Sequence, residues 1–372
     1  VLLCLWPQPL LAVWYLSLKL CPCLSVTRDT QAERDASSTA HSAGADAEMD
    51  AAVMAAMRQC LDTDGFLCLS AEVLAPLLQR DDLVARLAVG VARLVELGHS
   101  PSSICVYDEH WELIRRLSPL LEAVTGNTAS GDIFTFHKSA DRKHTGANTH
   151  GFGSNPHRDK PTAGPESFRA DGAAKYCTVW IALTDATPAS SCLYVIPKTL
   201  DPGYYLEGDA LVAALPGTSS TPTRVVDDAA TTPHAAAAVD LGARRFENIQ
   251  AVPVDAGGGC VFSHRLVHWG SRPSTGALPR VAMSYALADN LGEFEIGEFF
   301  SHAAYSPFPP LELRVALRAA QAVLYCEQKP FEKGGLGLAT RIWRRGSRFF
   351  EPRFRTKVND AAQWEKFMQG RR

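Results

Sequence analysis

The spacing of apolar residues is helical in the part of the chain that begins at Met49. Val53, Met57 and Leu61 recur every four residues and so share one face of an amphipathic helix. Three more segments show a similar pattern, with Ser70 as an N-cap of the first and Gly126 as the terminator of the last. The helices predicted for this front cover residues 49–61, 71–78, 81–98 and 107–125.

Beyond residue 126 the period of the apolar residues falls from about 3.6 to two, which indicates β-strands. Many short strands bounded by Gly, Pro and Asp, after a block of helices, favour an antiparallel barrel or jelly roll over alternating βαβ units. We therefore expect a mainly β fold with flanking helices. The predicted strands are 66–69, 133–136, 176–183, 193–196, 259–268 and 280–288.

Three segments differ in residue composition from the rest of the chain and indicate the domain organisation. The first 26 residues are apolar but interrupted by Pro7, Pro9 and Lys19, so we expect no stable membrane span, and a shortened targeting signal or anchor is one interpretation. An Ala-, Ser- and Asp-rich linker follows. The predicted units are 1–48 as apolar segment and linker, 49–300 as the main domain with a surface insertion at 216–245, and 301–372 as a helical, basic extension.

The extension carries basic residues interleaved with Trp343, Phe350 and Phe354. Such a stretch could dock a phosphorylated partner or a membrane surface. We favour the simpler interpretation, a helix that packs its aromatic side onto the domain and leaves a solvated cationic face.

Composition adds limits on function. The 372 residues are 46% hydrophobic and 21% charged, which is typical of a globular protein. The net charge of -3 gives no cationic field that would attract nucleic acid. The ten cysteines are scattered without a CxxC motif, so we interpret them as reduced thiols in a cytoplasmic or organellar compartment.

The strongest chemical signal is the pair His157 and Asp159. In an extended segment, residues i and i+2 point to the same side, so both can bind one metal ion. His268 supplies a third ligand from a distant predicted strand, and His264, on the same strand face, is the alternative. Two imidazoles and a carboxylate on one face of a metal leave open positions, as in non-haem Fe(II) oxygenases.

Arg280 opens an apolar strand twelve residues after His268. Its planar guanidinium is suited to a bidentate pair with the far carboxylate of a 2-oxoacid that chelates the metal. Ser284 has the same strand parity and is expected to assist.

With these residues in place, the chain resembles the phytanoyl-CoA dioxygenase-like family of Fe(II)/2-oxoglutarate oxygenases over about residues 60–290. The resemblance implies a double-stranded β-helix, His157, Asp159 and His268 as iron ligands, and Arg280 as the 2-oxoglutarate anchor. Lys138 and Trp180 fall where family members line the co-substrate pocket. The segments that carry the resemblance are 64–67, 156–159, 178–185, 192–197 and 266–271.

The resemblance implies that Fe(II), 2-oxoglutarate and O2 oxidise a small molecule, lipid or secondary metabolite, with hydroxylation as the default outcome and succinate and CO2 as by-products. A metal-binding scaffold without turnover and a protein or peptide hydroxylase remain as alternatives. The intact Asp159 argues against the related halogenases, which have a small residue there. Ser190-Ser191 and Lys198-Thr199-Leu200 depart from the family pattern, so the loop at 198–206 and the substrate are not carried over.

Overall fold

A computed structural model describes most of the helical and β-rich regions. The surface insertion predicted at 216–245 and nearly all of the N-terminal segment 1–48 lie outside the described residues. These are 24–25, 51–140, 156–160, 162–206, 247–289, 299–300, 308–325 and 335–369.

The N-terminal helices form as the apolar spacing predicts. Ser70 caps its helix, because its hydroxyl accepts a hydrogen bond from the backbone N–H of Val73 at 3.3 Å. Gly126 ends the last helix with a φ of 66°, a left-handed conformation that favours glycine. The front consists of α3 (Ala51–Asp64), α4 (Ala71–Leu78), α5 (Leu83–Glu96) and α6 (Asp108–Thr125).

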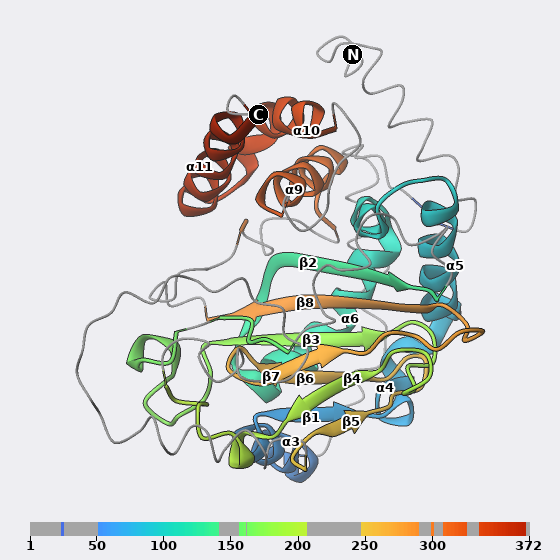
Figure 1. Ribbon diagram of the computed structural model, residues 1–372, viewed down its shortest axis with the longest axis vertical. Helices are drawn as coiled ribbons and strands as arrows, with labels where there is room; N and C mark the ends of the chain where they lie inside the picture. Colours follow the sequence, from blue (N-terminus) through green and yellow to red (C-terminus); the bar gives the residue numbers. More distant parts are fainter. Residues whose placement is uncertain are drawn as a thin grey trace, which may run out of the picture.

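Two antiparallel sheets confirm the predicted fold class (Figure 1). The larger sheet has the order β1-β6-β3-β8-β2 and the smaller one β5-β4-β7. In the larger sheet, strands far apart in the sequence are neighbours, so its pairings could not be read from local pattern. The strands are β1 (Phe66–Leu69), β2 (Thr128–Lys138), β3 (Tyr176–Ala182), β4 (Leu193–Ile196), β5 (Gln250–Val252), β6 (Gly259–Ser263), β7 (Val267–Gly270) and β8 (Arg280–Ala288).

The prediction of one strand over 259–268 is wrong. The chain turns after Ser263, and β6 and β7 belong to different sheets. The buried guanidinium of Arg265 holds this turn by donating to the backbone carbonyls of Tyr204 and Gly203, at 3.0 and 3.1 Å. His264 therefore lies in the turn and does not share a strand face with His268.

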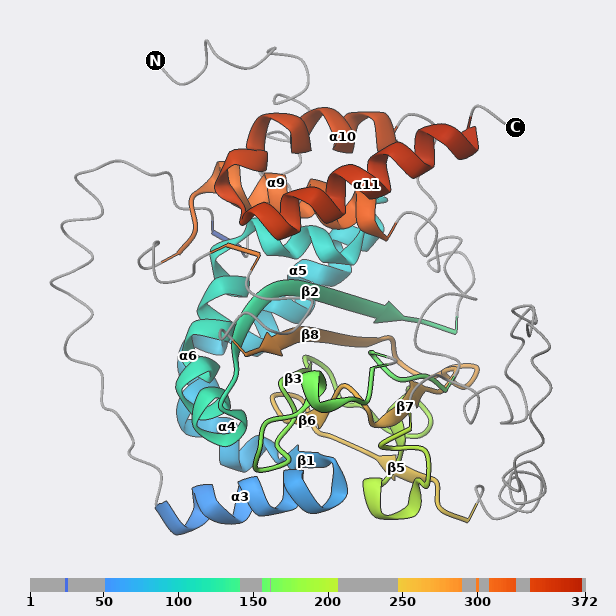
Figure 2. The ribbon, with the colours of Figure 1, turned by 90° about the vertical axis from the view of Figure 1, so that its left-hand side faces the viewer.

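Alternate residues of the larger sheet serve two different cores. On β3 and β8, Val179, Met283 and Tyr285 pack with the helices α5 and α6. Residues of the opposite parity, such as Trp180 and Ala282, pack with the smaller sheet. Figure 2 shows the helices on one side of the large sheet and β5 and β7 on the other. The space between the two sheets is the one that the candidate site occupies.

Three C-terminal helices cover the β2 edge of the large sheet: α9 (Leu311–Leu324), α10 (Gly335–Gly346) and α11 (Pro352–Gln369) (Figure 2). A buried ion pair joins Arg314 of α9 to Asp108 of α6 at 2.6 Å. Trp343, Phe350 and Phe354 are buried, while most basic residues around them are exposed, as the simpler interpretation predicts. In the described part of the chain, no helix combines the length and apolar character of a membrane span.

His110 of α6 is fully buried, and neither ring nitrogen has a hydrogen-bond partner among the described residues. Burial, assisted by the positive charge of Arg314, lowers the pKa of His110 to about 3. Between pH 6.5 and that value the unfolded state therefore binds a proton that the native state does not. The histidine destabilises the fold as the pH falls through this window.

We expect His110→Phe to flatten the pH dependence of stability. The wild type should lose up to about 1.4 kcal/mol of unfolding free energy for each pH unit below 6.5 through this group alone, and the variant should lose that much less. Urea unfolding from pH 8 to pH 4.5 measures both slopes. Parallel curves below pH 6.5 would contradict the assignment, and above pH 7.5 the slopes should agree.

Candidate metal centre

A cavity of about 130 Å³ lies between the two sheets. Its wall on the large sheet consists of even-numbered residues of β2, β3, β6 and β8, because alternate side chains face the smaller sheet. All seven predicted site residues line it. They are the metal-ligand candidates His157, Asp159 and His268 and the co-substrate candidates Lys138, Trp180, Arg280 and Ser284.

The three metal-ligand candidates lie together at one wall of the cavity. Each offers a donor atom within 4.8 Å of the other two, and His264 is not in this group. The Nε2 atoms of His157 and His268 lie 3.9 and 3.6 Å from Asp159 Oδ1. The structure thus brings together two imidazoles and one carboxylate, the donor set that suits Fe(II) with open coordination positions.

Backbone pairing positions these ligands. His157 and His268 exchange two hydrogen bonds, with N–H to carbonyl distances of 3.1 and 3.0 Å, so the segment of His157 extends the edge of β7. Arg158 points the opposite way and makes a buried two-pronged ion pair with Asp201, at 2.6 and 3.1 Å. This ion pair holds the segment on the side away from the cavity, while His157 and Asp159 face the cavity.

Further hydrogen bonds orient the ligand atoms. The ring Nδ1 of His268 lies 3.1 Å from the carbonyl oxygen of Leu266, so as a donor there it leaves Nε2 free to bind metal. The hydroxyl of Thr178 donates to Asp159 Oδ2, which leaves Oδ1 toward the two imidazoles. No sequence motif predicted this role for Thr178, although it shares the strand parity of Trp180.

Charge in the centre also suits a metal. Burial lowers the pKa of His268 to about 4, helped by the proximity of His157, so its imidazole is neutral at neutral pH. For Asp159, burial acts to raise the pKa, but His268 and His157 outweigh it and lower the pKa below its usual value. An ionised carboxylate and a neutral imidazole are the forms that bind Fe(II).

Arg280 lies at one end of the cavity and is only 2% exposed. Its Nε and Nη1 atoms are buried without a partner among the described residues. The guanidinium carbon lies 5.3 Å from the centre of the Trp180 ring and 5.9 Å from that of Phe136. Burial lowers the pKa of Arg280 to about 10, so the group stays charged at neutral pH and offers free donors to an anion.

Lys138 lies beside this arginine, and Ser284 lies four residues further along β8 in the same cavity wall. Lys138 is the direct partner of Arg280 in the pairing of β2 with β8, and Ser284 is paired with Trp180 on β3. Burial lowers the pKa of Lys138 to about 8, and repulsion by Arg280 contributes. Buried, unpartnered donors beside a second cation fit the far carboxylate of 2-oxoglutarate.

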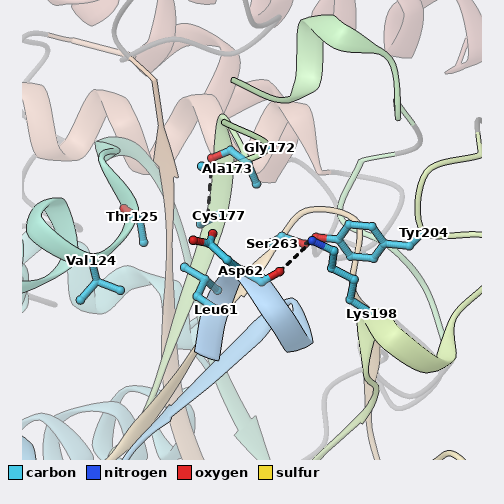
Figure 3. Close-up of a pocket in the computed structure, with 11 residues that line it drawn as sticks. Leu61, Asp62, Val124, Thr125, Gly172, Ala173, Cys177, Lys198, Tyr204 and Ser263 are labelled. Atoms are coloured by element: carbon cyan, nitrogen blue, oxygen red, sulfur yellow. Dashed lines mark hydrogen bonds between the residues drawn. The ribbon is translucent and has the colours of Figure 1, made fainter. Parts of the chain in front are cut away.

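A second cavity lies elsewhere and is too small to hold a substrate (Figure 3). Its volume of about 20 Å³ has room for one or two water molecules. Cys177 lines it and has the opposite strand parity to Thr178, so this cavity lies across β3 from the metal-ligand group. We therefore assign the chemistry to the larger cavity.

Comparison with known proteins agrees with this geometry. The model of the phytanoyl-CoA dioxygenase (PhyH) family matches residues 71–282, more than half of the chain. The match confirms the resemblance inferred from the motifs, and with it the expected iron- and 2-oxoglutarate-dependent oxidoreductase class. No curated protein sequence matches significantly.

Three solved structures illustrate the similarity in fold. The epimerase SnoN, in complex with Fe3+, α-ketoglutarate and nogalamycin RO, is 19% identical, with 64% of this chain and 85% of that chain covered and a TM-score of 0.43. AviO1 from Streptomyces viridochromogenes Tue57 is 21% identical, with 64% and 96% covered and a TM-score of 0.39. EctD from S. alaskensis, with 2-oxoglutarate and 5-hydroxyectoine, is 15% identical, with 65% and 77% covered and a TM-score of 0.36.

Proposed function

Because the chain belongs to the phytanoyl-CoA dioxygenase family, we propose that it is a dioxygenase that hydroxylates a small organic molecule and releases succinate and CO2 from 2-oxoglutarate. His157, Asp159 and His268 are the proposed iron ligands, and Arg280 is the proposed anchor of 2-oxoglutarate. Lys138, Trp180 and Ser284 are proposed to complete the co-substrate pocket.

The observation that carries this proposal is the unpartnered Arg280 in the same cavity as the metal-ligand group. A scaffold that only binds metal has no need for a buried guanidinium with free donors, since an unpaired buried cation is costly. A dicarboxylate with one end at the metal would compensate this charge. The arrangement therefore favours an enzyme with a 2-oxoacid co-substrate over a metal-binding scaffold.

The chain's own residues have separate tasks in this mechanism. When bound, iron and 2-oxoglutarate would supply the oxidising chemistry with O2 as the oxidant. His157, Asp159 and His268 would hold the iron, while Thr178 keeps Asp159 in orientation. Arg280 would bind the far carboxylate of 2-oxoglutarate, and the nearby rings of Trp180 and Phe136 would exclude water from that ion pair.

We expect Arg280→Met to weaken 2-oxoglutarate binding while iron binding persists. Loss of a charged hydrogen-bonding pair should raise the dissociation constant at least about tenfold. Anaerobic titration of the iron-loaded protein, followed by the charge-transfer absorbance of the chelate near ~500 nm, measures it. Arg341→Met, on the exposed face of α10, is the matched control and should bind like wild type.

Two outcomes would contradict the proposal. If wild type binds iron but shows no 2-oxoglutarate band, the scaffold interpretation replaces the enzyme. If the Arg280 variant binds 2-oxoglutarate as tightly as wild type, another residue is the anchor.

A further inference from the structure

A buried carboxylate, Asp132 of β2, lines the same cavity as the metal-ligand group and is 2% exposed. Tyr325, at the C-terminal end of α9, donates its hydroxyl to the carboxylate, with oxygen distances of 2.8 and 3.0 Å. Gln321 approaches Oδ1 at 3.5 Å, a long contact. Neither residue belongs to the segment that matches the family, which ends at residue 282.

Asp132 retains capacity for further hydrogen bonds. Burial raises the pKa of Asp132, while the charge of Lys160 and the hydrogen bond from Tyr325 act to lower it. In its ionised form the carboxylate accepts about four hydrogen bonds, whereas a tyrosine hydroxyl has one proton to donate. Among the described residues, no ion pair joins Asp132 to a basic side chain, although the charge of Lys160, which lines the same cavity, acts to lower the pKa of Asp132. A buried carboxylate with spare acceptor sites is stabilised by a donor that enters from the cavity.

The position of Asp132 separates it from the co-substrate anchor. It precedes Lys138 by six residues on β2, and Lys138 is paired with Arg280, so about 20 Å of strand separates the two ends. Thr178, which holds Asp159, is paired with Ala286 at the end away from Arg280, and Ala286 also lines the cavity. The metal-ligand group thus lies toward Asp132, on the far side from the 2-oxoglutarate anchor.

Aromatic rings surround this end of the cavity. Phe134 and Tyr325 have ring centres 4.8 Å apart, and Tyr176 lines the same wall. Aromatic faces bind apolar carbon and also favour a cationic group, and the Lys160 ammonium already lies 5.1 Å from the centre of the Tyr176 ring. The surroundings therefore suit a compact organic molecule that is apolar on its sides and carries one donor group.

We propose that Asp132, with Tyr325 beside it, is the specificity-determining acceptor for the substrate and binds a hydroxyl or protonated amine of a small polar molecule. This inference rests on the proposed function and narrows its substrate class. We expect molecules that present a carboxylate at this end to bind more weakly, because an ionised carboxylate has no proton to donate to Asp132.

A purely structural role for Asp132 is the competing explanation, because Tyr325 and Gln321 also connect α9 to β2 through it. A structural carboxylate affects stability but does not distinguish one cavity ligand from another. Ligand selectivity, and not loss of activity, is therefore the decisive readout.

Three probes of one size test the inference: cyclohexylamine, cyclohexanol and cyclohexanecarboxylate. Each is titrated by calorimetry under anaerobic conditions into protein loaded with Fe(II) and 2-oxoglutarate, so that the Arg280 end is filled. We expect the amine or the alcohol to bind at least about tenfold tighter than the carboxylate. Tight binding of the amine indicates an ammonium substrate, and tight binding of the alcohol alone indicates a hydroxyl substrate.

Asp132→Asn keeps the shape and removes the charge. The variant should bind the amine about tenfold more weakly, since a hydrogen bond to a charged group contributes roughly 1.5–3 kcal/mol. Its affinity for the alcohol should change about threefold or less. Tyr325→Phe removes the hydroxyl that donates to Asp132 but keeps the Asp132 carboxylate. Equal binding of all three probes to wild type, or identical selectivity in Asp132→Asn, would overturn the inference.

The charge-transfer band of the same samples separates this inference from the proposed function. If the band is present but the three probes bind equally, the dioxygenase proposal stands and the inference about Asp132 is wrong. If the band is absent from wild type, the proposed function fails, whatever the probes do.

Discussion

Asp159→Ala is expected to abolish iron binding and, with it, 2-oxoglutarate turnover. The variant leaves the imidazoles of His157 and His268 without the carboxylate oxygen that lies 3.9 and 3.6 Å from their Nε2 atoms. Removing an outer partner of a ligand already costs about 10- to 100-fold in metal affinity, so removal of the carboxylate itself should exceed ~100-fold. Anaerobic iron titration and succinate release measure the two losses.

A matched exposed carboxylate serves as the control. Asp360→Ala, on the exposed face of α11, should bind iron and release succinate like wild type. The iron affinity of Thr178→Val should lie between those of Asp159→Ala and Asp360→Ala, because this variant removes only the hydrogen bond to Asp159 Oδ2. If Asp159→Ala retains wild-type iron affinity, the His157, Asp159 and His268 assignment is wrong.

Breaking the ion pair behind the metal ligands is expected to have the largest effect on stability. Arg158 and Asp201 have side chains only 1% and 6% exposed. Removal of one partner leaves an uncompensated buried charge, which costs about 3–5 kcal/mol. Arg158→Met and Asp201→Asn should each lower the free energy of unfolding by about that amount, measured by urea denaturation without metal.

The double variant tests whether the two residues act as a pair. With both charges removed, the loss should be smaller than the sum of the single losses by roughly 0.5–3 kcal/mol. Arg93→Met is a suitable control, because its ion pair with Glu96 is about half exposed and contributes little. Additive losses would show that Arg158 and Asp201 stabilise the fold independently.

Local pattern predicted most of the helices and strands because each carries its own periodicity and terminating residue. It failed at residues 264–266, where the chain turns without Gly or Pro between two apolar runs. Leu266 and Val267 are buried, so the hydrophobic pattern continues through the turn. The fixing contacts come from Arg265 to carbonyls about sixty residues away, which no local window contains.

The candidate site was predicted where a motif fixes spacing and missed where contacts are long-range. His157 and Asp159 are two residues apart, and their shared direction follows from an extended backbone. Asp132 and Tyr325 lie 193 positions apart and have no common motif. Their proximity depends on how α9 packs against β2, which the fold alone establishes.

The division of the site between two sheets has a mechanical consequence. His157 and His268 belong to the edge of the smaller sheet, whereas Arg280 and Trp180 belong to the larger one. A small sliding of one layer over the other would change the distance between the proposed iron ligands and Arg280, and it would also strain the hydrogen bond from Thr178 of β3 to Asp159. The relative position of the two sheets therefore sets the distance that a diacid must span between the proposed iron ligands and Arg280. Mutations in the core between the sheets are expected to change the co-substrate preference without replacing any of these residues.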